Sequence, residues 1–284
     1  MTATSTAARR TRLRIVIADT GALVTGTALA ILFLLPLAWA GYSSLRGPDA
    51  TGEGAGFGTE NYRRLFSYGE GLLVYATNSI LVSLLTVVGT VLISVLAGYA
   101  IARFRFPGRN LLFLGTLAIM MVPYPTILIP LYVLLSRAGL QNSLIGLSLV
   151  LIMFQLPFAL FMMRNAFEAV PREFDEAALV DGAGIPRTLW SVLLPAVTPG
   201  VITVALFAFL NSWNEFIAPL MLVTDGSRYT LPVALAAMRS GNFGSIDFGA
   251  LQSGVVVSAV PCMLLFVLLQ RHYVRGFASG ALKG

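Results

Sequence analysis

The sequence contains few charged residues and few of the side chains that disulfide, metal or redox chemistry requires. Charged residues occupy only 11% of the 284 positions and hydrophobic residues 57%, whereas an ordinary soluble domain has roughly 25% charged residues. One cysteine, Cys262, and one histidine, His272, exclude a disulfide framework and a Cys/His zinc site. The mean hydropathy is +0.81. A chain this apolar has more hydrophobic residues than one core of its size could bury, so we expect lipid to cover much of the surface.

Lysine is nearly absent, and its absence excludes one kind of ATPase. The only lysine is Lys283, whereas a P-loop needs a lysine inside G-x-x-x-x-G-K-[ST] to reach the phosphates. We therefore expect no cofactor on this chain and place any ATP and Mg²⁺ on a partner subunit. The formal net charge of +6 does not predict nucleic-acid binding, because the arginines form short scattered groups.

Six apolar stretches are long enough to cross a bilayer, which predicts an all-α integral membrane protein with six transmembrane helices. The stretches are 22–42, 72–101, 111–135, 144–163, 201–222 and 251–269. A cleavable signal peptide is an alternative for the first stretch, but its apolar part is longer than usual for such a peptide. We expect one domain over 1–284, with an N-terminal segment 1–21, a membrane domain 22–271 that includes a loop at 165–200, and a tail 272–284.

The distribution of basic residues between the connecting segments predicts the orientation. The termini and the second and fourth loops carry 13 Lys and Arg residues, and the opposite side carries 6. By the positive-inside rule both termini are expected in the cytoplasm.

The fourth loop is unusually acidic and predicts an elbow of two short helices. Pro171 suits a first helical turn, acidic residues follow it, and Gly182 suits a left-handed helix end, so we expect a helix over 172–181. Its spacing places Phe174, Ala177, Ala178 and Asp181 on one side. A second short helix is expected over 187–194, against the membrane interface.

This loop also carries a family signature. Glu176-Ala177-Ala178, three residues, Gly182, nine residues and then Val192-Leu193-Leu194-Pro195 resemble the E-A-A motif of permease subunits of binding-protein-dependent ABC importers, with valine in place of the usual isoleucine. Further segments are similar to the carbohydrate branch, related to maltose-type inner-membrane permeases: 61–63, 102–108, 213–216 and 275–284.

The resemblance implies a fold, partners and a location. The expected fold is that of a type I ABC importer permease, multi-pass in the bacterial plasma (inner) membrane. The expected partners are a second homologous permease, two copies of a cytoplasmic ATPase and an extracytoplasmic sugar-binding protein. The residues that the resemblance assigns to coupling with the ATPase are Glu176, Ala177, Ala178, Asp181 and Gly182.

Polar residues inside the spans are candidates for the translocation path. Glu215 is the only ionisable residue within the six stretches, and Asn211, Asn214 and Gln155 accompany it. A carboxylate at membrane depth is expected to face water or a partner group, and amides and carboxylates suit sugar hydroxyls. The alternative is that these side chains bond between helices or to the second permease.

The expected function is therefore that of a membrane-spanning subunit of an ATP-driven importer of di- or oligosaccharides, not an enzyme. Glycerol phosphate or another small polar solute is an alternative cargo. An intramembrane enzyme would need a paired acid, a nucleophile with its base or a metal cluster, and a passive channel would leave the acidic elbow unexplained. An apolar segment at 229–238 is expected to form a re-entrant or interfacial helix.

Overall fold

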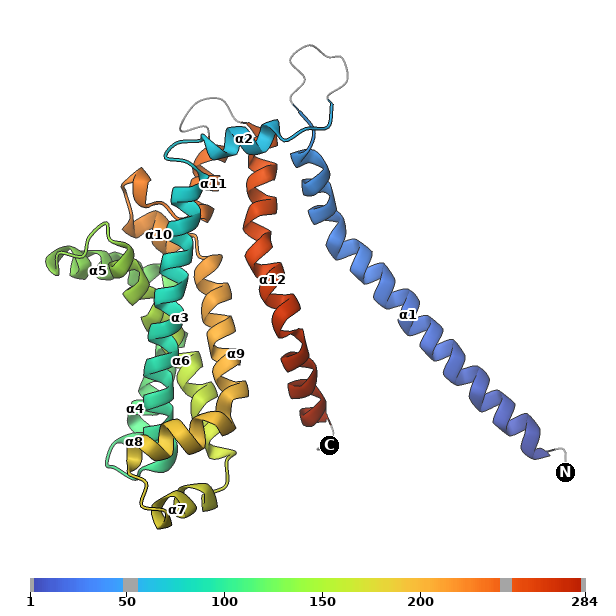
Figure 1. Cartoon of the computed structure of the whole chain (residues 1–284), viewed down its shortest axis with the longest axis vertical. Coiled ribbons are helices and arrows are strands. Elements are labelled where there is room, and N and C mark those ends of the chain that lie inside the picture. Colours follow the sequence, from blue (N-terminus) through green and yellow to red (C-terminus); the bar gives the residue numbers. More distant parts are fainter. Residues whose placement is uncertain (1–2, 48–55, 241–246, 282–284) are drawn as a thin grey trace. The chain divides into compact units, whose positions relative to one another are not determined.

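The computed structural model describes residues 3–47, 56–240 and 247–281, and the side chains of 20–47, 56–240 and 247–268. Within these ranges the chain forms helices and no strand, apart from one isolated bridge between Arg46 and Phe57 (Figure 1). The expectation of an all-α protein is confirmed. The elements are α1 (Ala3–Ser44), α2 (Glu60–Phe66), α3 (Leu72–Arg103), α4 (Arg109–Ala118), η1 (Ile119–Met121), α5 (Tyr124–Arg137), α6 (Leu144–Glu168), α7 (Glu173–Val180), α8 (Ile185–Arg187), η2 (Thr188–Leu193), α9 (Leu194–Trp213), α10 (Ile217–Leu222), η3 (Gly226–Arg228), α11 (Leu231–Arg239) and α12 (Phe248–Ala281).

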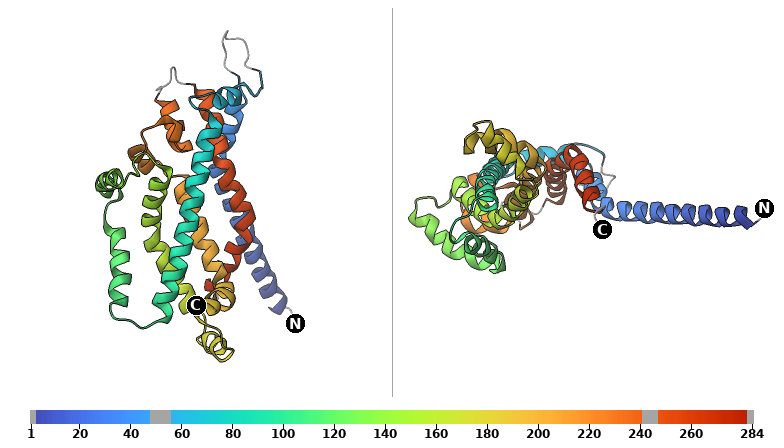
Figure 2. Two further views of the ribbon diagram at one scale, coloured as in Figure 1. Left: turned by 60° about the vertical axis from the view of Figure 1, so that its left-hand side comes forward. Right: turned by 90° about the horizontal axis from the view of Figure 1, so that it is seen from below.

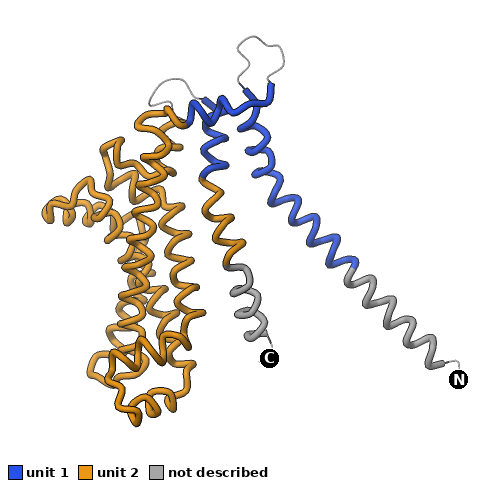
Figure 3. The backbone as a smooth tube through the Cα atoms, in the orientation of Figure 1, with its two compact units in different colours: residues 1–65, 247–257 blue, residues 66–246, 258–284 orange. Residues whose placement is uncertain are grey.

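The chain divides into two compact units, which are coloured separately in Figure 3. The first unit comprises residues 1–65 and 247–257, and the buried Asn61 side chain organises it. Its Nδ2 donates to the carbonyl oxygens of Ser44, at 2.9 Å, and of Arg46, where the C-terminal carbonyls of α1 need partners. Beside it the Arg64 guanidinium lies 2.8 Å from the Asp247 carboxylate, so α2 joins α1 to the start of α12.

The second unit comprises residues 66–246 and 258–284, and its centre is the packing of α3 against α6 and α9 (Figures 1 and 2). Small residues permit this close approach: a Cβ on Gly98 would lie 2.7 Å from the Met163 Cβ. The same stripe of small residues on α3 is fully buried at Thr86, Thr90 and Ser94. It is therefore a helix-packing surface within the unit.

Five helices in the described residues are long and apolar enough to span a membrane, and a bent pair brings the number to six if it counts as one span. The five are Thr20–Ser44, Leu72–Arg103, Leu144–Glu168, Ile185–Trp213 and Phe248–Leu268. These agree with the prediction for four of the six stretches, with shifts of a few residues at the ends.

The stretch 111–135, expected as the third transmembrane helix, is a bent pair of helices. The segments Arg109–Met121 and Tyr124–Arg137 meet at an angle of 107°. Pro123 explains the break, because a residue that precedes proline avoids the helical region. Val122 accordingly has an extended backbone, with ψ of 129°.

The boundaries of the fifth stretch are also corrected. The helix runs over Ile185–Trp213 and stops before Asn214, so the expected helix over 201–222 is broken and α10 follows as a separate turn. The expected separate helix over 187–194 is instead continuous with α9. The π-helical segment η2 lies just before Pro195, which has no N–H to donate, and the helix continues through this proline into α9.

Candidate functional site

The helix α7 forms as the acidic loop predicts, although it is one residue shorter at each end. Glu173, Asp175 and Glu176 occupy its first turn, where the helix dipole favours negative charge. At its end Gly182 has φ of +74°, a value that glycine adopts without a Cβ clash. The N–H of Ala183 donates to the Ala178 carbonyl at 2.9 Å and that of Gly182 to Leu179 at 3.0 Å, which together form a Schellman end.

The three residues of the E-A-A motif do not share one surface. Glu176 and Ala177 are exposed, whereas Ala178 is buried, with 5% exposure, where α7 packs on η2. Phe174, Ala177 and Asp181, expected on one side of the helix with Ala178, are exposed, whereas the packing of α7 on η2 buries Ala178, so the four residues do not form one exposed surface.

The outward face of α7 has a composition of its own. It consists of Glu173, Glu176, Ala177 and Val180, which follow helical spacing and are all exposed. Val180 has 89% exposure, high for an apolar side chain. The face therefore combines two carboxylates with small or apolar groups.

An ion pair that the sequence analysis missed holds the inner face of α7. Arg103, the last residue of α3, has its Nε 3.2 Å from the Asp175 Oδ2, and the two side chains are 7% and 21% exposed. The two atoms lie within ion-pair distance without the alignment of a hydrogen bond. A second guanidinium nitrogen of Arg103 donates to the Val170 carbonyl at 2.9 Å. The signal in the sequence is an arginine that closes an apolar run, but nothing there indicates its partner.

The segment η2 connects α7 to the helices of the second unit. Leu189 and Leu193 are buried in one cluster with Val95 of α3, Phe167 of α6 and Val197 of α9. Trp190, which belongs to the 187–194 segment expected against the membrane interface, is half exposed. The η2 half of the elbow is thus part of the hydrophobic core.

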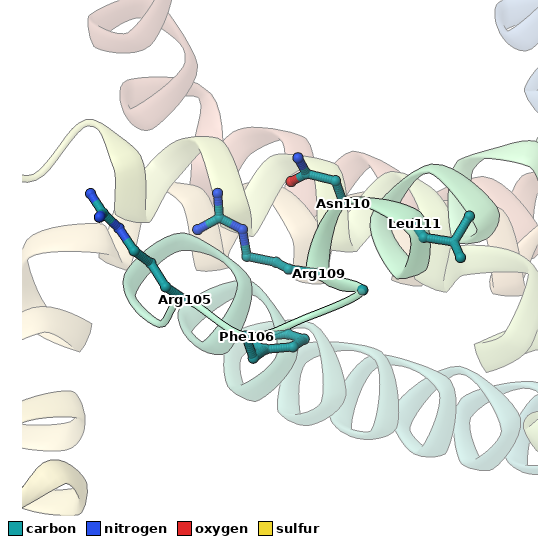
Figure 4. A pocket seen from close by; sticks show the side chains of 6 residues that line it. Arg105, Phe106, Arg109, Asn110 and Leu111 are labelled. Atoms are coloured by element: carbon teal, nitrogen blue, oxygen red, sulfur yellow. The ribbon is translucent and has the colours of Figure 1, made fainter.

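Three cavities of the described residues lie at this end of the second unit. The first, of about 380 Å³, is lined by residues that include Arg103, Asp175, Glu176 and Ile185. The second, of about 370 Å³, adjoins Arg103 and Arg172. The third, of about 300 Å³, lies in the turn between α3 and α4, where the guanidinium groups of Arg105 and Arg109 point to the same side (Figure 4). Arg105 lies in the 102–108 segment and Arg109 begins α4, so the turn brings two positive charges to the end of the unit that carries α7.

Two of the four residues expected in the translocation path meet directly. The Asn211 Nδ2 on α9 donates to the Gln155 Oε1 on α6 at 3.1 Å, and Asn211 is exposed. Asn214 is also exposed, and its Nδ2 donates to the Leu210 carbonyl of its own helix at 2.7 Å.

Glu215 has a local structural partner that the sequence analysis did not anticipate. Its Oε1 accepts hydrogen bonds from the N–H groups of Ile217, at 2.8 Å, and Ala218, at 3.0 Å. The carboxylate thereby caps the start of α10, where N–H groups otherwise lack partners. The break after α9 and this cap belong to one local arrangement, and a role for Glu215 in the path stays a prediction.

The segment expected as a re-entrant or interfacial helix is α11, and its side chains are mostly buried within the second unit. The preceding loop is fixed by Asn78, whose Nδ2 donates to the carbonyl oxygens of Ser227, at 2.9 Å, and Tyr229, at 3.0 Å. In this loop the hydroxyl and N–H of Ser227 donate to Asp225 and hold the pKa of that carboxyl below its usual range.

The sequence has similar curated proteins in several organisms. The diacetylchitobiose uptake system permease protein NgcG of Streptomyces coelicolor is 33% identical over 261 residues, which cover 89% of this chain and 85% of the relative. The trehalose/maltose transport system permease protein MalG of Thermococcus litoralis is 34% identical over 79% of this chain and 81% of its own length. The sulfoquinovosyl glycerol transport system permease protein SmoH of Agrobacterium fabrum is 35% identical over 79% and 78%.

The chain also resembles a solved structure and matches a family model. A solved chain of a bacterial ABC transporter involved in the import of the acidic polysaccharide alginate superposes with a TM-score of 0.77, at 22% identity, over 92% of this chain and 97% of that chain. Residues 89–279, which include α7 and its elbow, match the model of the binding-protein-dependent transport system inner membrane component. The chain belongs to this family of multi-pass inner-membrane transporter permeases.

Proposed function

We propose that the chain is one of two transmembrane subunits of an ATP-driven importer of di- or oligosaccharides. The similar permeases are named for diacetylchitobiose, for trehalose and maltose, and for sulfoquinovosyl glycerol, all of which carry many hydroxyl groups. The observation that carries the proposal is α7 itself. It is a capped helix at one end of the second unit, with Glu176 and Ala177 exposed on its outward face.

The outward face of α7 supports docking to a cytoplasmic ATPase. Ala177 has no long side chain and permits close approach, and Glu173 and Glu176 can each form a charge-assisted hydrogen bond with a basic residue of the partner. Gly182 fixes where α7 ends. Ala178 and Asp175, on the inner face, hold α7 to its own chain.

The hydrogen bond between Asn211 and Gln155 supports a polar path beside α6 and α9. Each amide keeps further donor or acceptor capacity, which suits sugar hydroxyls. In the proposed complex this path is shared with a second permease, and a sugar-binding protein delivers the substrate from outside.

The proposed orientation places α7 and both termini in the cytoplasm. The imbalance of 13 basic residues against 6 supports this orientation. Three of the 13 lie around the turn between α3 and α4, which is in the same end of the second unit as α7 (Figure 1).

The deciding experiment is ATPase activity of the reconstituted complex against a panel of solutes. The panel contains disaccharides, longer oligosaccharides, glycerol phosphate and a polar non-sugar solute, each presented with the binding protein. Stimulation by disaccharides or oligosaccharides supports the proposal. Stimulation by glycerol phosphate alone would show that the cargo is glycerol phosphate and not a di- or oligosaccharide. Failure of an ATPase to copurify with the chain would contradict the coupling assignment.

A further inference from the structure

The guanidinium group of Arg103 joins the end of α3 to the coupling loop at two points. One is the Asp175 carboxylate on α7, at 3.2 Å, and the other is the Val170 carbonyl just before α7, for which the donor–acceptor distance is 2.9 Å. The Arg103 side chain is only 7% exposed. A buried cation is costly unless its partners stay in place, so the arginine resists any movement that separates α7 from α3.

The other attachment of α7 is weaker in kind. Ala178 is the only residue of α7 that is buried, and it contributes a single methyl group to the contact with η2. The remaining apolar side chains of α7 are exposed, among them Leu179, at 71%, and Val180, at 89%. Apolar contact scales with buried area and has little directional preference, so the contact through Ala178 does little to fix the direction of α7 on η2.

The helix that Arg103 terminates is also the one that packs along the path. α3 lies against α6, which carries Gln155, and against α9, which carries Asn211. Close contacts such as Gly98 on Met163 leave α3 no room to slide separately from α6. A force applied to α7 therefore has a direct route to the path helices through Arg103.

We propose that Arg103 is a positioning residue that fixes α7 to the end of α3, so that α3 follows displacements of α7. This inference rests on the proposed function of α7 as the ATPase-docking helix. The ion pair between Arg164 and Glu168, at 2.8 Å, lies within α6, and the Arg164 guanidinium also lies over the Phe113 ring of α4, 4.2 Å from its centroid, so neither contact of Arg164 involves α7. Arg164→Gln is therefore a matched control: it removes the same kind of charge from the same end of the second unit.

The first test measures position in the full chain in lipid nanodiscs, without any partner. Spin labels are attached to cysteines at Val180 and Val88, which are 89% and 63% exposed, after Cys262→Ser removes the native thiol. In the parent and in Arg164→Gln we expect one narrow distance distribution. In Arg103→Gln we expect a distribution at least twice as wide, with unchanged helical content. The same width in Arg103→Gln and Arg164→Gln would overturn the proposal.

The second test separates positioning from folding. Asp175→Asn leaves the hydrogen bond of Arg103 to Val170 available, so it is the milder variant if Arg103→Gln fails to insert. The exchange Arg103→Asp with Asp175→Arg restores opposite charges. We expect Arg103→Gln and Asp175→Asn to copurify with the ATPase. In both variants, stimulation of ATP hydrolysis by substrate should fall about fivefold or more, which is the size of effect that loss of a coupling free energy produces.

The exchange should then recover at least half of the stimulation. Recovery supports the pair as a positioning device, and parent-like stimulation in both single variants contradicts it. If no ATPase copurifies with the parent chain, the proposed function fails, but the spin-label distances still decide the role of Arg103.

Discussion

Asn211 on α9 donates a hydrogen bond to Gln155 on α6, with the nitrogen and oxygen 3.1 Å apart. Two amides that lie on neighbouring helices within predicted spans thus satisfy part of each other's hydrogen-bonding capacity. Each amide still has groups left over, since Asn211 keeps its carbonyl oxygen and Gln155 its amino group.

The first prediction concerns this pair. Gln155→Leu removes the acceptor of Asn211 and one polar group of the proposed path, so uptake should fall about tenfold, by analogy with the loss of about 1 to 1.5 kcal/mol of hydrogen bonding. Uptake of labelled sugar and copurification of the partner subunits are the measurements. Thr203→Val is the control, because the Thr203 hydroxyl bonds the Pro199 carbonyl of its own helix. A loss of assembly in Gln155→Leu would show that the pair serves subunit contact and not the path.

A second prediction concerns Glu215. Glu215→Leu removes the cap of α10 and should lower the free energy of unfolding by about 1 kcal/mol, whereas Glu215→Gln retains an acceptor oxygen and should lose less. If Glu215 also borders the path, uptake should be higher in the glutamine variant than in the leucine variant at equal assembly. Thermal unfolding in detergent and uptake in cells are the measurements. Parent-like behaviour of both variants would remove Glu215 from both roles.

The helix α7 shows which parts of this architecture can be predicted from sequence. Pro171, the acids and Gly182 act on the backbone next to them, and the structure has a helix with a left-handed end at that place. The Glu215 cap is equally local, since its donors follow within three residues. Its signal is in the sequence, but the carboxylate is interpreted from the sequence only as part of the path or as a partner of another helix or of the second permease.

The third and fifth spans show what local signals leave open. Pro157 lies inside α6 without ending it, whereas Pro123 stands where the third span breaks. Proline alone therefore does not say whether a helix continues, because the neighbouring packing decides. The ion pair between Arg103 and Asp175 could not be predicted for another reason. The two residues are far apart along the chain, and only the packing of α3, η2 and α7 brings them together.

A third prediction tests the end of α7. A Cβ on Gly182 meets no atom within 4 Å, so Gly182→Ala is strained only through its φ of +74°. We expect a cost of about 1 to 2 kcal/mol and a weaker association with the ATPase. Gly184→Ala is the control, because Gly184 has φ of −73°. Gly182→Pro should be more severe, since it also removes the N–H that donates to Leu179.

Reversal of charge on the outward face tests the docking surface separately from the fold of α7. Glu176→Lys should reduce copurification of the ATPase at low salt while membrane insertion persists, because an exposed carboxylate contributes mainly to the contact with a basic partner. The same reversal at Glu60, which is exposed and lies in the first unit, is the control. Equal ATPase recovery from both variants would contradict docking through this face.

The last prediction concerns orientation, on which the assignment of α7 to an ATPase depends. Ser191 is exposed in η2, and Arg137 is exposed at the end of α5. With Cys262→Ser as background, a cysteine at Ser191 should resist a membrane-impermeant thiol reagent in intact cells and react in inverted vesicles. A cysteine at Arg137, which the basic-residue count places outside, should show the opposite pattern. Because the two sites lie in one compact unit, labelling of both from the same side would contradict the span arrangement. Exchange of the two patterns would reverse the topology and place α7 where no cytoplasmic ATPase can reach it.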